Sequence, residues 1–221
     1  MKIHRDIKQG TDEWRRVRLG VVTASDCDRI VTPATLKRSG QVRGYVAEIV
    51  AEALIGQPFD YTAGKWAERG QVVEAEARDY FSLMVEPVEE VGFISRDDGL
   101  VGCSPDGIAE GRFGLELKCP AAKTHVGYLL EPDALYAAYR LQVQFSLWLT
   151  RWPAWWLVSY CPSLPAVRRL VEPEATVFAA LDDAVPAVLA AKAEALAKIA
   201  AMQDELPEDE DAKAAAIAFG I

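Results

Sequence analysis

The amino-acid sequence predicts a single α/β domain in which a central mixed β-sheet is flanked by helices. Three observations predict it. The chain of 221 residues is long enough to bury a substantial core. Its composition, 51% hydrophobic and 26% charged, is ordinary for a globular protein. Extended segments near the middle of the chain lie between stretches with helical periodicity. We expect one domain over residues 1–221, with a core at about residues 9–160 and a helical C-terminal region at about residues 174–221.

The first part of the chain is predicted to be mainly helical. Thr11 precedes two acidic residues and is a favourable helix N-cap, and Gly20 marks the end of that helix. Thr23 opens a second helix. Apolar residues recur at three- and four-residue steps after Tyr45, as expected for a helix with one buried face. The expected helices span residues 11–20, 23–30, 45–54 and 64–81, the last in two pieces that meet near Gly70, with a loop at residues 32–44.

The middle of the chain is predicted to supply the sheet. Pro105 biases the residue before it toward an extended conformation, Gly107 permits a turn, and a second extended segment follows. These features predict a hairpin-like pair of strands whose second member spans residues 113–119. Further strands are expected at residues 88–94, 100–103, 152–160 and 167–171, helices at residues 133–150 and 174–202, and an irregular segment at residues 121–130.

Two carboxylates and a lysine are spaced for one face of this hairpin. Side chains alternate along a strand, so Glu116 and Lys118 project to the same side, and Asp106 on the neighbouring segment can face Glu116. Two hard oxygen ligands suit Mg²⁺ or Mn²⁺, and the backbone carbonyl of Leu117 is a natural third ligand. Lys118 can then orient or help to deprotonate an attacking water. Such a set is typical of metal-dependent phosphodiester hydrolysis.

The same residues admit a plainer interpretation. Asp-Gly is a common turn dipeptide, and Glu-x-Lys on a strand is often a solvated face with a weak ion pair. The choice therefore depends on other parts of the chain. Glu74 lies on the apolar stripe of its helix, where a carboxylate needs a metal ion or a hydrogen-bond donor. Tyr139 and Gln142 share one face of the helix that follows the hairpin.

Charge is unevenly distributed along the chain. The net charge of −9 argues against simple non-specific binding of nucleic acid, but Lys and Arg concentrate near the N-terminus, which indicates one basic surface. Arg18, with the hydroxyls of Thr23 and Ser25 at a predicted helix start, makes an anion site; the alternative is an ordinary cap beside a solvated arginine. Lys37 and Arg38 lie in the loop that follows, which is either inert or in contact with nucleic acid.

Composition also excludes several kinds of site. The four cysteines are scattered without a CxxC pair and the two histidines are far apart, so we expect buried thiols and neither a zinc site nor a disulfide framework. No apolar run approaches the roughly 18 residues of a membrane span, and the N-terminus lacks the apolar region of a signal peptide. We therefore expect a cytoplasmic protein with no membrane partner.

Four ordered blocks carry a more specific signal. The central block is Ser-Pro-Asp-Gly at residues 104–107, followed by Gly-Leu-Glu-Leu-Lys-Cys-Pro at residues 114–120. The other blocks are Gln9-Gly10 with Trp14 and the run from Arg18 to Ser25; Gly70 with Glu74, Ala77 and Phe81; and residues 142–150. Together they resemble the phage lambda exonuclease family of viral recombination nucleases, in the PD-(D/E)xK superfamily. The resemblance covers roughly residues 9–160.

This resemblance implies the PD-(D/E)xK nuclease core and a Mg²⁺-dependent exonuclease. Such an enzyme degrades the 5′-ended strand of linear double-stranded DNA and leaves a 3′ single strand for phage-type homologous recombination. Two metal ions are implied, for which Mn²⁺ would substitute, with Glu74 completing the second site directly or through water. Lys118 and Gln142 would serve the attacking water. The implied catalytic centre comprises Asp106, Glu116, the Leu117 carbonyl, Lys118, Gln142 and Glu74.

The resemblance also implies how DNA is held. Arg18 and Ser25 occupy the positions that bind the terminal 5′-phosphate. The family forms a ring-shaped homotrimer and works with a single-strand annealing protein in the bacterial host cell. The alternatives are an endonuclease of the same superfamily and a non-catalytic DNA-end-binding protein. The other residues expected on the DNA-binding surface are Thr23, Ser104, Tyr139, Lys37 and Arg38.

Overall fold

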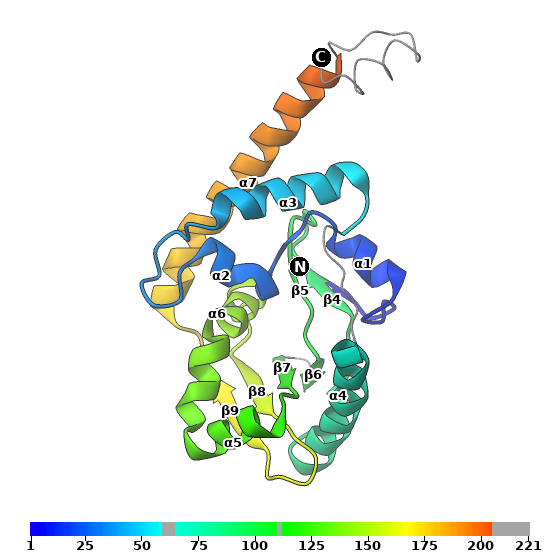
Figure 1. Ribbon diagram of the computed structural model, residues 1–221, viewed down its shortest axis with the longest axis vertical. Coiled ribbons are helices and arrows are strands. Elements are labelled where there is room, and N and C mark those ends of the chain that lie inside the picture. The colour runs from blue at the N-terminus through cyan, green and yellow to red at the C-terminus, as the bar shows by residue number, and fades with distance from the viewer. Residues whose placement is uncertain (59–64, 110–111, 205–221) are drawn as a thin grey trace.

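The computed structural model describes residues 1–58, 65–109 and 112–204. These residues form two β-sheets with helices packed around them (Figure 1). The predicted α/β fold class is confirmed, and the strands divide between two mixed sheets where the sequence predicts a single central one. The C-terminal region expected beyond residue 204 lies outside the described residues.

The four-stranded sheet has the strand order β1-β4-β5-β2. β4 pairs antiparallel with both β1 and β5, and β2 pairs parallel with β5. The parallel pair brings Thr23 of β2 beside Gly102 of β5, so the chain enters the Ser104 region next to the segment that carries Ser25. Its members are β1 (Lys2–His4), β4 (Phe93–Ser95), β5 (Val101–Cys103) and β2 (Val22–Thr23).

The five-stranded sheet has the strand order β3-β6-β7-β8-β9. β7 and β8 run parallel in register from the pair Phe113 and Ala154 to the pair Lys118 and Ser159, and the other neighbours are antiparallel. The edge strand β9 has the bounds that the sequence predicts. The members are β3 (Val88–Glu89), β6 (Gly107–Ala109), β7 (Phe113–Lys118), β8 (Ala154–Ser159) and β9 (Val167–Val171).

Two glycines explain where strand predictions were wrong. The strand expected at residues 88–94 is split between the two sheets as β3 and β4, and at Gly92 between them an added Cβ would lie 2.0 Å from the carbonyl oxygen of Ile7. Gly107, expected in a turn, begins β6, and an added Cβ there would lie 2.0 Å from Cγ1 of Val88. Both glycines permit close packing between segments rather than a local turn.

The helix predictions are confirmed at some positions and wrong at others. Thr11 caps the first helix, since its Oγ1 accepts a hydrogen bond from the N–H of Trp14 at 3.3 Å. The helix expected from Thr23 is instead a 3₁₀ turn, Ala24–Asp26, followed by the four-residue α2. The helices are α1 (Asp12–Arg18), α2 (Cys27–Ile30), α3 (Val42–Ile55), α4 (Lys65–Met84), α5 (Ala122–Leu130), α6 (Pro132–Thr150) and α7 (Ala175–Asp204).

Two of these helices correct the sequence analysis. α4 is continuous rather than divided near Gly70: one glycine costs a helix only about 1 kcal/mol, and Phe81 of the same helix is buried against Leu115 and Leu117 of β7. Residues 121–130, expected to be irregular, form α5. Its buried His125 bonds Oγ of Ser159 through Nδ1 at 2.7 Å and donates from Nε2 to the carbonyl of Pro165 at 2.9 Å, so tertiary contacts fix a segment with weak local signals.

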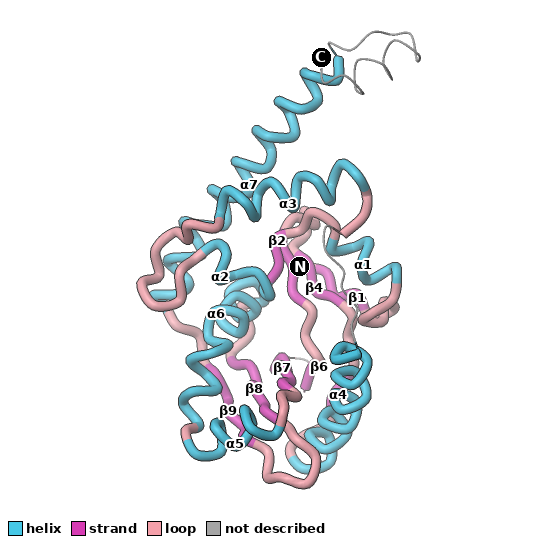
Figure 2. Tube along the Cα trace, viewed as in Figure 1, coloured by secondary structure: helices cyan, strands magenta, loops and turns pink. Residues whose placement is uncertain are grey.

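α4 and α6 cover different parts of the sheets (Figure 2). Phe81 of α4 packs with Leu115 and Leu117 of β7, while α6 packs on β8 and β5. Because Leu115 and Leu117 point toward α4, the intervening Glu116 points toward α6. α7 crosses α3 and continues beyond the body of the molecule (Figure 1). Among the described residues, no helix combines the length and apolar character required to span a bilayer.

Candidate active site

Strand β7 presents Glu116 and Lys118 on one side of the five-stranded sheet, as the alternation predicts. Nζ of Lys118 lies 2.6 Å from Oε1 of Glu116 and donates to Oε1 of Gln142 at 3.1 Å. Nε2 of Gln142, from α6, donates to Oε1 of Glu116 at 2.7 Å. The three side chains therefore form a closed hydrogen-bonded group in which each one restricts the other two.

Gln142 rather than Gln144 reaches this group. Gln144 is fully buried, and its amide donates to the hydroxyl of Tyr136 and the carbonyl of Glu172 at 2.9 and 2.8 Å. Its Oε1 accepts from the N–H of Glu174 at 2.9 Å. Gln144 thus joins α6 to the segment before α7 and does not face the carboxylates.

Asp106 lies directly before β6 and is held against β7 by two backbone contacts. Its N–H donates to the carbonyl of Leu115 at 2.9 Å, and its Oδ2 accepts from the N–H of Leu117 at 2.6 Å. These bonds go to the two residues that flank Glu116, so Asp106 lies beside Glu116 at the start of the neighbouring strand β6. Both residues are buried, with exposed fractions of 8% for Asp106 and 5% for Glu116.

Carboxylates crowd this region. Burial raises the pKa of Asp106 well above its usual value, and the charges of Glu116 and Glu74 raise it further. Burial also raises the pKa of Glu74, and the charge of Arg78 opposes that shift. The crowding favours an additional cation, which would stabilise the ionised carboxylates.

Lys118 supplies part of the required positive charge. Burial by itself lowers the pKa of Lys118, but the charge of Glu116 and the hydrogen bond to it outweigh burial, so the net effect is an increase. Its Nζ also lies 4.4 Å from the centroid of the Tyr139 ring, a cation–π contact. Lys118 is therefore a cation that can donate hydrogen bonds in this arrangement.

The donor set fits Mg²⁺ or Mn²⁺. Asp106 and Glu116 offer hard carboxylate oxygens, and the carbonyl of Leu117, whose N–H already donates to Oδ2 of Asp106, is the candidate backbone ligand. Glu74 is less free, because its Oε1 accepts from Nη2 of Arg78 at 2.9 Å. No three His, Cys, Asp or Glu side chains of the described chain already surround a common point. A bound ion would therefore complete its shell with backbone, water and phosphate oxygens, as Mg²⁺ commonly does.

Arg18 lies at the centre of the predicted anion site. Its Nη1 donates to Oγ of Ser104 at 2.8 Å and its Nη2 to Oγ of Ser25 at 3.4 Å, while its guanidinium lies 4.5 Å from the centroid of Trp14. Within the described residues, its hydrogen-bond partners are hydroxyls rather than carboxylates. Burial lowers the pKa of Arg18 and the charge of Asp26 opposes this. A half-buried guanidinium with hydroxyl neighbours is suited to binding a phosphate.

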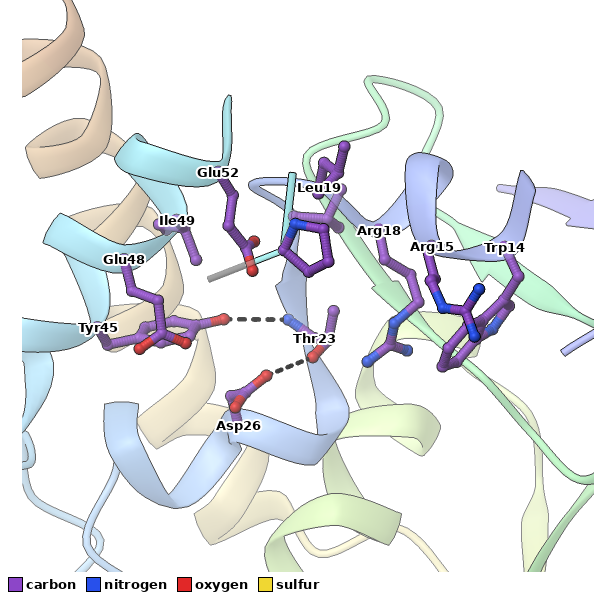
Figure 3. A pocket seen from close by; sticks show the side chains of 12 residues that line it. Trp14, Arg15, Arg18, Leu19, Thr23, Asp26, Tyr45, Glu48, Ile49 and Glu52 are labelled. Carbon is purple, nitrogen blue, oxygen red and sulfur yellow. Dashed lines mark hydrogen bonds between the residues drawn. The ribbon is translucent and has the colours of Figure 1, made fainter. Parts of the chain in front are cut away.

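Thr23 bonds Asp26 and Tyr45 beside Arg18 (Figure 3). Its Oγ1 donates to Oδ2 of Asp26 at 2.7 Å, and its N–H donates to the hydroxyl of Tyr45 at 3.3 Å. Thr23 is only 3% exposed, so it does not face solvent. Its Oγ1 lies 2.9 Å from Oγ of Ser25, and this hydrogen bond helps to fix the Ser25 side chain. The adjoining helical segments are short, so the candidate anion site consists of the hydroxyls and Arg18 and has no long helix dipole.

One cavity of about 220 Å³ joins the anion site to the carboxylates. Arg18, Ser25 and Ser104 line one part of it, and Asp106, Glu116 and Gln142 line another. Residues that are far apart in the sequence are thus brought to one continuous space. A phosphate held by Arg18 and a second phosphate group near Asp106 could belong to the same nucleotide chain.

The remaining predicted DNA contacts lie nearer the surface. Tyr139 and Gln142 line a neighbouring cavity of about 240 Å³ together with Pro33 of the loop between α2 and α3. Lys37 and Arg38 are exposed in that same loop. The loop therefore borders the site through Pro33, and DNA contact by its two cations stays a prediction.

Two residues that hold the site together are not among the predicted site residues. Arg78 donates from Nε to the carbonyl of Asp106 at 2.7 Å and bonds Glu74, so it ties α4 to the metal-ligand candidates. Its spacing of four residues from Glu74 was the available signal. Gln9 donates from Nε2 to the carbonyl of Pro105 at 2.8 Å, a contact between segments that no local pattern predicts.

Comparisons with known sequences gave two matches. The model of the YqaJ-like viral recombinase domain matches residues 13–152. Escherichia coli (strain K12) ExoD is 34% identical over 70 residues, which are 30% of this chain and 80% of ExoD.

Three of the similar solved structures are of exonucleases. The alkaline exonuclease LHK-Exo from Laribacter hongkongensis is similar over 89% of this chain and 100% of its own, with a TM-score of 0.74 and 26% identity. Its complex with dAMP gives a TM-score of 0.76 and 27% identity over the same shares. A phage-related exonuclease from Haemophilus somnus 129PT shares the fold, with a TM-score of 0.64 and 13% identity over 81% of this chain and 96% of that chain.

Proposed function

The chain belongs to the YqaJ-like viral recombinase domain family, and from this premise we propose that it is a Mg²⁺-dependent 5′-to-3′ exonuclease acting on linear double-stranded DNA. It would degrade the 5′-ended strand and leave a 3′ single strand for recombination. The observation that carries the proposal is the cavity shared by Arg18 and the Asp106–Glu116 pair. An anion site beside the catalytic carboxylates favours a chain end with a terminal phosphate over an internal position.

Each side chain of the group has a proposed role. Asp106, Glu116 and the Leu117 carbonyl would hold two metal ions, with Glu74 at the second ion directly or through water. When bound, Mg²⁺ supplies charge stabilisation and makes water a better nucleophile. Lys118 donates hydrogen bonds that orient the attacking water and offset charge developing on the phosphate. Gln142 fixes both Lys118 and Glu116, because it donates to one and accepts from the other.

The assembly is part of the proposal. We propose a ring-shaped homotrimer that retains DNA in a channel, with a single-strand annealing protein as partner. A ring needs little affinity for DNA, which agrees with a net charge of −9 per chain. Light scattering measures the mass directly, and a monomer at micromolar concentration would contradict the ring without affecting the assignment of the site.

Digestion of paired substrates tests the function. Linear 5′-phosphorylated duplex and covalently closed circular duplex are each incubated with the protein, with and without Mg²⁺. We expect the linear strand to shorten from its 5′ end only with Mg²⁺, and the circle to stay intact. Cutting of the circle would identify an endonuclease. Intact linear DNA that is nevertheless retained on the protein would identify a non-catalytic end-binding protein.

Arg18→Ala is expected to reduce kcat/KM on 5′-phosphorylated ends about 100-fold and on 5′-hydroxyl ends less than about threefold. The reason is that each charge-assisted hydrogen bond to the terminal phosphate contributes about 1.5–3 kcal/mol and has no counterpart on a hydroxyl end. Initial rates on the two substrates measure the effect. Arg16→Ala, an exposed arginine on the same helix, is the matched control and should leave both rates unchanged. Equal slowing on both ends by Arg18→Ala would remove Arg18 from phosphate recognition.

A further inference from the structure

A tight turn connects the two halves of the anion site. Arg18 is the last residue of α1, and the N–H of Val21 donates back to its carbonyl at 3.0 Å. Leu19 has φ −59° and ψ 120°, and Gly20 has φ +68°. These values describe a type II β-turn, whose third residue needs a positive φ and is usually glycine. Beyond the turn, the chain enters β2 and reaches Ser25.

Two helices that are distant in the sequence, α3 and α7, form hydrogen bonds to the backbone of Gly20. The N–H of Gly20 donates to Oε2 of Glu52, from α3, at 3.0 Å. Figure 3 shows Glu52 directed toward the segment that contains Leu19. The carbonyl of Gly20 accepts from Nζ of Lys192, from α7, at 2.7 Å across 172 positions of sequence. An added Cβ at Gly20 would lie 2.8 Å from the carbonyl oxygen of Ile49, so α3 also leaves no room for a side chain at this position.

The two clamps act on different peptide groups. Glu52 holds the peptide between Leu19 and Gly20, whose orientation distinguishes a type II from a type I turn. Lys192 holds the next peptide, between Gly20 and Val21. Together they fix the path between Arg18 and the strand that leads to Ser25.

Lys192 is an unusual choice for a purely stabilising contact. Its side chain is buried, with a residue exposure of 9%, and in the described chain its hydrogen-bond partner is a neutral carbonyl. Burial lowers the pKa of Lys192, and the charge of Glu52 opposes this. Desolvating an ammonium offsets much of what such a bond contributes to stability. What the contact does specify is the position of one carbonyl in the turn.

We propose that Lys192 is a positioning residue for recognition of the 5′-phosphate, so that the C-terminal helix α7 belongs functionally to the anion site. This inference rests on the proposed function. Arg18 bonds Ser104 and Ser25 at 2.8 and 3.4 Å, and a phosphate must fit the same three groups. Loss of the clamp frees the turn, and a small displacement of Arg18 relative to Ser25 weakens recognition of the phosphate without removing any group that contacts it.

The test compares Lys192→Met with Lys198→Met, an exposed lysine on the same helix. For the wild type and both variants, kcat/KM is measured on otherwise identical duplexes with 5′-phosphate and 5′-hydroxyl ends. The readout is the ratio of the two values, which does not depend on the fraction of folded protein. We expect Lys192→Met to reduce the ratio about fivefold to tenfold, as expected for partial loss of a charge-assisted hydrogen bond, mainly through KM on phosphorylated ends. Lys198→Met should match the wild type.

The outcomes separate the two proposals. An unchanged ratio in Lys192→Met, with both rates equal to wild type or reduced in parallel, shows a merely structural role and overturns the inference. Lys192→Arg provides a second check, because its guanidinium keeps a cationic donor and should restore part of the ratio. If the wild type digests linear DNA with no preference for phosphorylated ends, the protein has no 5′-phosphate site and this inference is refuted. A wild type that digests no DNA at all refutes the proposed function itself.

Discussion

Asp106→Asn is expected to lower the rate of DNA digestion on the order of a thousandfold or more while leaving the protein folded. The change removes the charge of a proposed metal ligand, and losing such stabilisation of the transition state costs a phosphoryl-transfer enzyme several kcal/mol. Asparagine has nearly the same side-chain shape as aspartate. The asparagine carbonyl can still accept the hydrogen bond from the Leu117 N–H, which Oδ2 of Asp106 accepts at 2.6 Å.

Asp106→Asn is expected to increase the thermal stability of the protein although it lowers the rate of digestion. Because burial and the charges of Glu116 and Glu74 raise the pKa of Asp106, its ionised form destabilises the folded state above the ordinary pKa of an aspartate. Replacing Asp106 with a neutral side chain is therefore expected to raise the melting temperature at neutral pH when Mg²⁺ is absent. The rate of digestion is measured with Mg²⁺, and the melting temperature is measured by thermal unfolding without Mg²⁺.

A matched control is Asp133→Asn, whose side chain is 98% exposed and paired only at the surface with Arg169. It should change neither rate nor melting temperature appreciably, because exposed ion pairs contribute about 0–1 kcal/mol. Turnover by Asp106→Asn within tenfold of the wild type would refute the assignment of Asp106 as a metal ligand.

Lys118→Met is expected to slow digestion by about a hundredfold to ten-thousandfold, the range typical of groups that assist proton transfer or orient a nucleophile. Metal binding should survive, because both carboxylates remain. Calorimetric titration with Mg²⁺ separates the two cases: it should detect binding to Lys118→Met and much weaker binding to Asp106→Asn.

Removal of Lys118 should also destabilise the protein, in contrast to Asp106→Asn. Glu116 keeps its buried charge but loses the ammonium 2.6 Å away, and an unpaired buried charge is costly. Added Mg²⁺ is expected to restore part of the lost melting temperature by supplying the missing cation. Lys123→Met, an exposed lysine on α5, is the control. If Lys118→Met digested DNA at the wild-type rate, the lysine would be a structural counterion and not part of the catalytic group.

Local sequence patterns predicted the elements whose cause lies in neighbouring residues. Side-chain alternation along residues 113–119 predicted that Glu116 and Lys118 share a face, and the structure joins both to Gln142. The cap at Thr11 and the edge strand at Val167–Val171 also follow from neighbouring residues alone. The spacing of Asp106 from Glu116 fits a hairpin because nine intervening residues suffice to reverse the chain. Such features depend on backbone geometry over a few residues, which periodicity and turn residues report directly.

The other features depend on tertiary contacts, which join segments that carry no local sign of one another. Gly107 is required by the close approach of Val88 and not by a turn. The buried pair of His125 and Ser159 fixes a helix that local signals leave irregular. The clamp of Lys192 on Gly20 spans 172 positions. A residue's type and neighbours limit what it can bond, but packing chooses its partner, because burying a polar group is favourable only where the fold supplies a matching donor or acceptor.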